Sequence, residues 1–447
     1  MKNNKEALRR LYTLIVAAVM VLVHVLLIFV VLNMVYNKGF RTQLYFKGHL
    51  FVIAIYSVVF VALGQIFGGI SIGYRKKGEV LFSELFTAII SDLVFYLIAM
   101  MLSYRFPNPT PVLGALGLQI IFSACWISIA ANIYSNVFRP YDMLLIYAGE
   151  STEAFVEKLK TRADYFHITD RICADEDIEK IHAAIDRHNT VMLWDVQMPL
   201  RNFLFKYCYD NSKRIYVMPN ISDIILNGSK SLHLFDTPLL LTEGNPLQYE
   251  ERVIKRAMDV LLAIVLLVIA SPIMLITAIA IKLGDGGPIL YKQIRCTKNN
   301  REFYIYKFRS MIVNAEKNGA PLLAKQKDPR ITPVGAVIRQ LRIDELPQLF
   351  NVLKGDMSFV GPRPERPELI KKYMEDMPEF SYRLKVRAGI TGYAQLYGKY
   401  NTKPYDKLKL DLYYIEQYSI WLDIKLIILT VKIIFTKEST EGVKENE

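Results

Sequence analysis

The sequence predicts a membrane protein in three parts: a bundle of four transmembrane helices, a small α/β domain, and an α+β domain with a re-entrant helix-break-helix in the membrane. Three observations predict this division. Apolar residues make up 52% of the 447 residues and form long runs near the N-terminus. After residue 141, short apolar runs alternate with amphipathic stretches. One later apolar run carries a proline, Pro272, near its midpoint.

Composition limits the partners of the chain. We place the three parts at residues 1–140, 141–250 and 251–436, followed by a polar tail at 437–447. The formal net charge is +12 and is concentrated in the last third, so we expect membrane lipids and phosphorylated substrates as partners. No nucleic-acid motif is visible, and nucleic acid is not an expected partner. The four cysteines have neither metal-binding nor redox spacing.

Four apolar runs meet the roughly 20-residue requirement for crossing a bilayer. They lie at 11–36, 50–72, 82–102 and 111–134. The first is too long for a signal peptide and has no cleavage site, so we interpret it as an anchor. More basic residues flank the side of the N-terminus than the opposite side, and the positive-inside rule therefore places both ends of the bundle in the cytoplasm.

Two ionisable residues, Glu84 and Asp92, interrupt the third run. Ionisable side chains at membrane depth suggest a functional site by default. For Asp92 we favour a contact between helices or subunits over a transport path, because no polar run continues such a path. Glu84 lies near the end of the run, and we expect it to reach the membrane interface.

The segment 141–250 predicts a Rossmann-like α/β domain with a parallel sheet. Strands are expected at 143–148, 165–168, 191–194 and 215–218, and helices at 152–160, 177–188 and 198–209. Only one glycine, Gly149, follows the first strand, where a dinucleotide loop needs three. We therefore expect a scaffolding, regulatory or dimerising role, and the extra domains offer surfaces for a homodimer.

The apolar run at 260–281 is long enough to span the membrane, so a fifth transmembrane helix is the simplest interpretation. However, basic residues flank both ends of the run, which places both ends at the same, cytoplasmic face of the membrane. Ser271 and Pro272 stand at the midpoint, where proline removes a helix hydrogen bond and a serine hydroxyl can replace it. Each half is about 16 Å long at 1.5 Å per residue, roughly half of the hydrocarbon layer. We therefore predict a re-entrant hairpin.

The stretch 339–365 is the candidate reaction centre. Asp344 stands where a helix N-cap would, and Glu345 follows it, with Arg339 upstream and Arg363 between two prolines downstream. A helix N-terminus and fixed arginines suit a diphosphate, and carboxylates held there can attack phosphorus or hold a divalent metal. The alternative is that Asp344 only caps an amphipathic helix.

Other basic residues surround this stretch. Lys307 and Arg309 lie on one face of an expected strand at 303–308, which forms a hairpin with 289–293; a solvated strand edge is the alternative. Arg330 begins another turn. Segments 382–387 and 405–418 are expected to be interfacial helices, and 422–435 an interfacial anchor.

Several ordered motifs over residues 255–435 resemble those of the bacterial sugar transferases, the polyprenyl-phosphate glycosyl-1-phosphate transferases. The motifs are Lys-Arg-Ala-Met-Asp at Lys255, Ser271-Pro272, Lys-Phe-Arg-Ser-Met at Lys307, Asp-Pro-Arg-Ile-Thr at Asp328, Asp344-Glu345, Gly-Pro-Arg-Pro-Glu at Gly361 and Ala-Gly-Ile-Thr-Gly at Ala388. Each motif alone is weak evidence for this family, but the ordered set is specific for it. The preceding spans and α/β domain resemble the long members of that family, which use undecaprenyl phosphate.

The resemblance implies transfer of a sugar-1-phosphate from a UDP-sugar to undecaprenyl phosphate with release of UMP. The setting it implies is the cytoplasmic face of the bacterial inner membrane, at the first membrane step of exopolysaccharide, capsule or O-antigen synthesis. Asp344 is implied to form a covalent phosphosugar intermediate, and Glu345 to hold Mg²⁺. Substrate binding is expected from Arg339, Arg363, Lys307, Arg309 and Arg330, and presentation of the lipid phosphate from Lys255 or Arg256.

Two alternatives remain open at this point: a metal-dependent glycosyltransferase that releases UDP, and a non-catalytic scaffold of a polysaccharide complex. The chain also departs from the family pattern. Arg342-Ile343 stands where many members have Ser-Leu, and Tyr397 and Lys399 stand where Asn and Arg are common. These departures leave the sugar and acceptor preference open.

Overall fold

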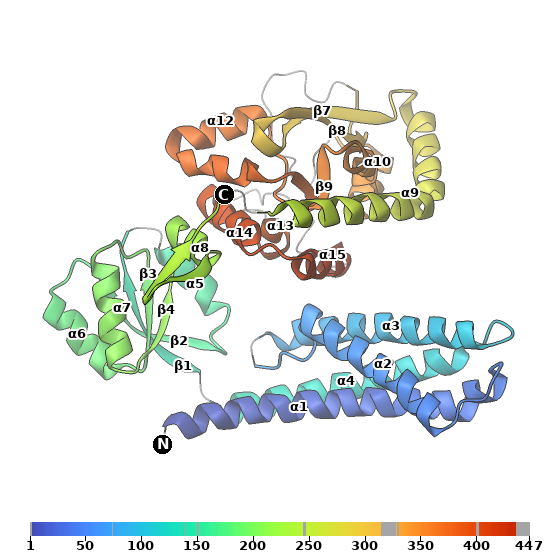
Figure 1. Cartoon of the computed structure of the whole chain (residues 1–447), viewed down its shortest axis with the longest axis horizontal. Coiled ribbons are helices and arrows are strands. Elements are labelled where there is room, and N and C mark those ends of the chain that lie inside the picture. Colours follow the sequence, from blue (N-terminus) through green and yellow to red (C-terminus); the bar gives the residue numbers. More distant parts are fainter. Residues whose placement is uncertain are drawn as a thin grey trace. The chain divides into compact units, whose positions relative to one another are not determined.

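The structure, a computed structural model, describes residues 2–73, 75–138, 140–149, 152–244, 247–313, 328, 330–398 and 402–434. Two compact units, Met1–Met218 and Pro219–Glu447, make up the chain (Figure 1). Residues 219–250, which we assigned to the α/β domain, lie in the second unit. Residues after 218 belong with the second unit because α8 (Ile221–Asn227) packs against α14 (Pro404–Glu416). Lys399 and the predicted tail at 437–447 lie outside the described residues.

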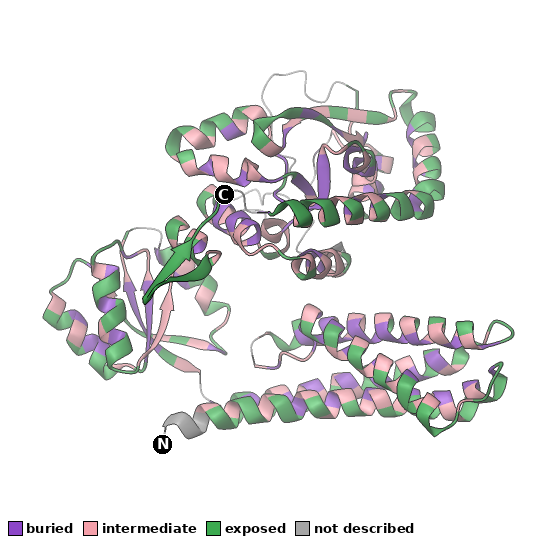
Figure 2. Ribbon diagram, in the orientation of Figure 1, coloured by how far each residue is buried: buried purple, intermediate pink, exposed green. Residues whose placement is uncertain are grey.

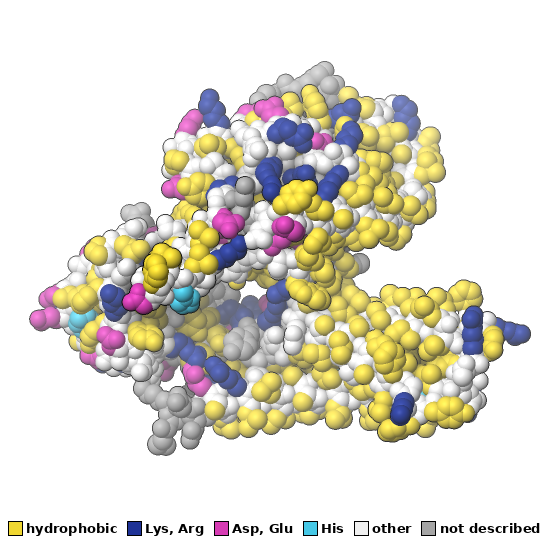
Figure 3. All heavy atoms as spheres, in the orientation of Figure 1, with side chains coloured by type: hydrophobic (Ala, Val, Ile, Leu, Met, Phe, Trp, Pro, Cys, Tyr) yellow, Lys and Arg dark blue, Asp and Glu magenta, His cyan; other side chains and the backbone are white. Residues whose placement is uncertain are grey.

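Four helices of the first unit pack into a bundle: α1 (Lys2–Val31), α2 (Phe46–Phe67), α3 (Lys77–Leu102) and α4 (Thr110–Val137). Each overlaps one predicted span. With α9 (Tyr249–Asp285), they are the five helices of the described chain that are long and apolar enough to cross a membrane, as expected of a membrane protein. Figures 2 and 3 show that much of their outer surface is exposed and apolar. Lipid in place of water makes such a surface favourable.

Polar side chains meet inside this bundle. The hydroxyl of Tyr56 donates to Asp92 Oδ1 at 2.9 Å, and Gln119 Nε2 donates to the same oxygen at 3.4 Å. The contact between helices predicted for Asp92 is therefore present. Glu84 is only 1% exposed, and its Oε1 lies 3.4 Å from His24 Nε2. The expectation that Glu84 reaches the membrane interface is wrong, because its side chain points into the bundle.

A four-stranded parallel sheet with the order β2-β1-β3-β4 forms the core of the α/β part. Its strands are β1 (Tyr141–Tyr147), β2 (Phe166–Cys173), β3 (Thr190–Trp194) and β4 (Arg214–Val217), and its helices are α5 (Thr152–Lys160), α6 (Ile178–Arg187) and α7 (Leu200–Asp210). The type and the order of these strands and helices agree with the prediction. Ile146 and Leu193 of the sheet pack with Ile181 of α6 and Leu204 of α7. Strands buried in this way read as continuous apolar runs, which made them easy to predict.

The second unit combines short strands with helices around α9. Its other elements are β5 (Lys230–Leu234), β6 (Thr237–Leu241), β7 (Leu290–Cys296), β8 (Glu302–Phe308), α10 (Pro333–Gln340), α11 (Gln348–Lys354), β9 (Met357–Val360), α12 (Pro367–Asp376), β10 (Ala388–Thr391), α13 (Tyr393–Tyr397) and α15 (Ile420–Ile434). The β7–β8 hairpin is confirmed, and the segments predicted at 405–418 and 422–435 are helical as α14 and α15. Their interfacial position stays a prediction. The segment predicted as a helix at 382–387 falls largely in a 3-10 helix, Pro378–Lys385.

Both ends of α9 contact other elements of the second unit. Near its start, Asp259 accepts a hydrogen bond from Ser358 of β9 at 3.0 Å, and near its end Ile281 packs with Phe308 and Ile338. A straight helix would separate Asp259 from Ile281 by about 33 Å. Figure 1 shows how α9 instead turns sharply between its two halves.

The sequence explains this bend. Pro272 lies inside α9 and lacks the N–H that would bond to the carbonyl of Val268. The hydroxyl of Ser271 donates to that carbonyl at 2.8 Å instead. Serine thus satisfies the carbonyl that proline leaves free, so the helix bends without an unpaired group.

Candidate active site

Asp344 and Glu345 lie side by side in a short 3-10 turn, Ile343–Glu345, between α10 and α11. The turn follows Arg342, whose φ of +55° is left-handed. Non-glycine residues in that region cost about 1 kcal/mol or more and cluster at functional sites. α11 begins only after Pro347, which occupies its N-cap position. The prediction that Asp344 caps the helix is wrong, because its carboxylate precedes the helix and is not tied to its first N–H groups.

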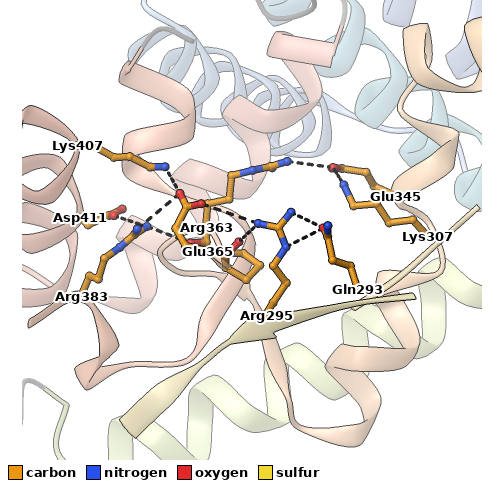
Figure 4. Close-up of polar contacts among 10 residues, drawn as sticks. Gln293, Arg295, Lys307, Glu345, Arg363, Glu365, Arg383, Lys407 and Asp411 are labelled. Atoms are coloured by element: carbon orange, nitrogen blue, oxygen red, sulfur yellow. Dashed lines mark hydrogen bonds and ion pairs between the residues drawn. The ribbon is translucent and has the colours of Figure 1, made fainter. Parts of the chain in front are cut away.

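Two cations hold Glu345. Lys307 Nζ, from β8, lies 2.7 Å from Glu345 Oε1, and Arg363 Nη2 lies 3.4 Å from the same oxygen (Figure 4). The Glu345 side chain keeps 18% of its surface exposed. A substrate anion can therefore reach this cluster, which brings together three residues predicted from the sequence.

The pKa values of the two carboxylates move in opposite directions. Burial would raise the pKa of Glu345, but the charges of Lys307 and Arg363 outweigh it and hold that pKa well below its ordinary value. Burial and the negative charge of Glu345 raise the pKa of Asp344 to about 6, against the opposing charges of Lys307 and Arg339. Two carboxylates with separated pKa values are typical of a pair with separate chemical roles.

Backbone pairing of two motifs positions Arg363. β9 and β10 pair in parallel, and beyond them Gly361 N donates to the Thr391 carbonyl and Gly389 N to the Pro362 carbonyl, each at 2.9 Å. A Cβ on Gly389 would lie 2.1 Å from Gly361 N, so only glycine permits this approach. The two prolines beside Arg363 restrict its backbone further.

A buried charge cluster secures the same segment (Figure 4). Glu365 pairs with Lys407 and, at 3.6 Å, with Arg383. Arg383 is 2% exposed, donates to the Arg363 carbonyl at 3.0 Å, and pairs with Asp411 at 2.8 Å. Movement of Arg363 would therefore disturb several buried ion pairs at once.

This charge cluster was not predicted from the sequence. Glu365 ends one of the motifs, and Lys407 and Asp411 are four residues apart on an expected helix, a spacing that places them on one face. That spacing was the available signal. Nothing local marks Arg383 as their partner, because its contacts come from distant elements.

The other arginines predicted to bind substrate differ in whether they lie near the carboxylate pair. Arg339, in α10, lies near enough to the carboxylate pair to lower the pKa of its first member. Arg309 pairs with Asp285 at the end of α9. Arg330 donates to Asp328 through Nε at 2.9 Å and through Nη2 at 2.6 Å. The structure thus places Arg339 at the candidate site and engages Arg309 and Arg330 with other acids.

The predicted lipid-phosphate residues are bound within the protein. Lys255 Nζ lies 2.6 Å from Asp423 Oδ2, and their side chains are 11% and 0% exposed. Arg256 donates to the carbonyls of Val352 and Leu353, at 2.6 and 2.8 Å, near the end of α11. In this structure both cations therefore have partners within the protein, and their presentation of the acceptor phosphate stays a prediction.

The carboxylate pair fits a magnesium ion shared with a substrate. Among the described residues, no three His, Cys, Asp or Glu side chains gather into a metal site. Mg²⁺ commonly takes one or two carboxylates and completes its shell with water and substrate phosphates. Glu345 is ionised, and both cations bind its Oε1. Among the described residues, no side chain donates a hydrogen bond to the other oxygen, Oε2.

Comparison with known proteins identifies the family. Residues 250–437 match the family model described as bacterial sugar transferase. A Bacillus subtilis protein, provisionally named as an undecaprenyl-phosphate N-acetylgalactosaminyl 1-phosphate transferase, is 52% identical over 131 residues, which are 29% of this chain and 73% of that protein. The chain belongs to the bacterial sugar transferase family. The resemblance drawn from the motifs is confirmed.

Two longer relatives of this sugar transferase each match about half of the chain. UDP-N-acetylgalactosamine-undecaprenyl-phosphate N-acetylgalactosaminephosphotransferase of Aeromonas hydrophila is 44% identical over 225 residues, 50% of this chain and 52% of that protein. Undecaprenyl-phosphate glucose phosphotransferase of Komagataeibacter xylinus is 40% identical over 226 residues, 49% of this chain and 42% of that protein. The chain therefore matches about half the length of these relatives.

Proposed function

We propose that the protein transfers a sugar-1-phosphate from a UDP-sugar to undecaprenyl phosphate and releases UMP. Membership of the family and the substrates in the names of its relatives support this reaction class. The observation that carries the proposal is the unequal carboxylate pair. Glu345 is held as an anion by Lys307 and Arg363, and beside it the pKa of Asp344 is raised to about 6.

In the first half-reaction Asp344 acts as the nucleophile. Its carboxylate oxygen forms a bond to the phosphorus that carries the sugar, and the bond from that phosphorus to the oxygen of UMP breaks. UMP leaves with the electron pair of that bond, and the sugar phosphate stays on Asp344 as an acyl phosphate. A raised pKa makes the carboxylate more basic, and hence a better nucleophile, while it remains ionised at pH 7.5.

In the second half-reaction the lipid phosphate takes the sugar phosphate. One of its oxygens bonds to the same phosphorus, the acyl phosphate bond breaks, and the Asp344 carboxylate returns. The product is a polyprenyl diphosphate sugar. Arg339 and Arg363 stabilise the negative charge that builds on the phosphoryl oxygens.

Glu345 would hold Mg²⁺ together with oxygens of the donor diphosphate. When bound, the ion supplies charge neutralisation at those oxygens. Lys307 keeps Glu345 ionised and oriented for this role.

The bend of α9 supports a re-entrant insertion at the cytoplasmic face of the inner membrane. From Pro272 to Asp259 or to Asp285 is about 13 residues, or about 20 Å, which is less than the roughly 30 Å of hydrocarbon. α9 therefore enters and returns on one side, while α1 to α4 cross. A Lys371→Cys substitution in a cysteine-free background places a thiol on exposed α12, and an impermeant maleimide should label it only from the cytoplasmic side.

The released nucleotide tests the proposed reaction. Membranes that contain the protein would be incubated with undecaprenyl phosphate and, in turn, UDP-N-acetylgalactosamine, UDP-galactose and UDP-glucose. We expect UMP and a lipid-linked sugar with one of these donors, and neither with Asp344→Asn. Release of UDP instead would indicate a glycosyltransferase and contradict the proposal.

A further inference from the structure

A single side chain of α11 links the two segments that carry the Lys307–Glu345 pair. Asn351 is fully buried. Its Oδ1 accepts a hydrogen bond from Tyr306 N at 3.0 Å, and its Nδ2 donates to the Tyr304 carbonyl at 2.7 Å. Both tyrosines belong to β8. The amide therefore joins α11 to the backbone of β8 at two points.

These two hydrogen bonds use the outer edge of β8. In the described part of the chain, β8 pairs with β7 alone. Residues two apart in a strand direct their backbone groups to the same edge, so the Tyr304 carbonyl and Tyr306 N both face away from β7. Buried backbone groups need a partner. The amide of Asn351 supplies the donor and the acceptor that a third strand would otherwise supply.

The amide lies next to the ion pair of the candidate site. Lys307 directly follows Tyr306, and Glu345 lies in the 3-10 turn that precedes α11. Lys307 Nζ lies 2.7 Å from Glu345 Oε1 (Figure 4). A lysine side chain is long and flexible, so its ammonium stays on one acceptor only where the backbone holds it within reach. Asn351 fixes that backbone relative to the helix behind Glu345.

Apolar packing also holds β8 in place. Phe303 and Ile305 are buried, and Phe308 packs with Ile338 of α10. Apolar contacts are not directional, whereas hydrogen bonds depend on distance and angle. A small slide of β8 past α11 would keep much of the packing but would break both hydrogen bonds of Asn351. The amide is therefore the contact that sets the position of the strand along its own axis.

We propose that Asn351 is a positioning residue for the transfer reaction, which holds β8 against α11 so that Lys307 stays on Glu345. This inference rests on the proposed function. The side chain is fully buried and both of its polar atoms are bound to β8, so it does not contact substrate. Its effect on the reaction passes through Lys307.

A double-mutant cycle tests this role. The kcat for nucleotide release would be measured for the natural protein, Asn351→Ala, Lys307→Met and the double variant. We expect kcat to fall about tenfold in Asn351→Ala, with the KM for undecaprenyl phosphate unchanged. The double variant should lose about as much as Lys307→Met alone, because no ammonium is left to position. Coupled sites are non-additive in this way, whereas independent sites multiply their losses.

The first unit offers a matched control. Asn37 also binds two backbone groups: its Nδ2 donates to the Leu44 carbonyl at 3.1 Å, and its Oδ1 accepts from Leu44 N at 2.6 Å. Asn37→Ala should keep the natural kcat. All variants would be assayed well below their melting temperatures. If Asn351→Ala fails to fold, Asn351→Asp replaces it in the cycle, because aspartate keeps the volume and the acceptor for Tyr306 N and loses only the donor.

Two results would overturn the proposal. Natural kcat in folded Asn351→Ala would show that packing alone positions Lys307. An equal factor of loss with and without the Lys307→Met substitution would show that Asn351 only stabilises the fold. The cycle compares rates and can be followed with either nucleotide, so release of UDP would contradict the proposed reaction without hiding the coupling of Asn351 to Lys307.

Discussion

Lys307 Nζ lies 2.7 Å from Oε1 of Glu345, although 38 positions separate the two residues in the sequence. The β7–β8 hairpin thus supplies the cation that keeps one carboxylate of the pair ionised. The neighbouring carboxylate, on Asp344, is left with a raised pKa. This contact accounts for how adjacent acids can take different roles.

Removing the Lys307 charge should impair catalysis. In Lys307→Met, Glu345 loses its nearest cation, and we expect kcat/KM for UMP release to fall about 100-fold, equivalent to about 2.7 kcal/mol. Lys307→Arg keeps the charge and should lose less. The control is Lys292→Met on neighbouring β7, where the lysine is exposed and does not contact Glu345. Equal activity in both Met variants would contradict this role.

Activity should have an acidic limb set by Asp344. Because the pKa of Asp344 is about 6, the nucleophile gains a proton below that pH, and kcat/KM should fall tenfold per pH unit. Lys307 lowers this pKa, so the limb should move to higher pH in Lys307→Met. A profile that stays flat down to pH 5 would contradict the assignment.

Ionised Asp344 should cost stability at neutral pH. Its folded pKa, about 6, lies above the ordinary value of 3.8, so the cost is fully present above pH 6 and disappears as pH falls from 6 to below 3.8. Asp344→Asn should therefore be more stable than the natural protein at pH 8, by at most about 3 kcal/mol. The difference in melting temperature should shrink as the pH falls toward 4. A variant less stable at pH 8 would contradict this argument.

The buried cluster behind Arg363 should affect catalysis without contacting substrate. Glu365→Gln removes the shared acid of Lys407 and Arg383, and loss of one member of a buried charge cluster typically costs about 3–5 kcal/mol. We expect a lower melting temperature and a fall in kcat of about tenfold. Glu368→Gln, on the exposed surface of α12, is the matched control. If folded Glu365→Gln kept full kcat, the cluster would have no role in positioning Arg363.

Local patterns were sufficient for much of the architecture. The apolar spans, the parallel sheet and the break at Ser271 and Pro272 follow from hydrophobic runs, their lengths and one proline, which are properties of neighbouring residues. The carboxylate pair was predictable for the same reason, because its motif is contiguous. The helix start was misplaced because Asp344 and Glu345 belong to a separate 3-10 turn, and α11 begins only after Pro347.

The partners of individual charges could not be read from the sequence. Lys255 pairs with Asp423, 168 positions away, and Arg309 pairs with Asp285 across a whole hairpin. A basic residue beside a membrane segment has the same local pattern whether it binds a lipid phosphate or a buried acid. The partners that Lys255 and Arg256 have within the protein come from distant elements, so only the fold could show them.

The most direct test of the reaction is to trap the intermediate. The protein would be mixed with a UDP-sugar that carries ³²P in the sugar-linked phosphate, without the lipid acceptor, and quenched in acid. We predict radiolabel on the protein, located by proteolysis in the peptide that contains residue 344, and no label in Asp344→Asn. Unlabelled natural protein that nevertheless turns over donor with acceptor present, or labelling that persists in Asp344→Asn, would contradict a covalent intermediate on Asp344.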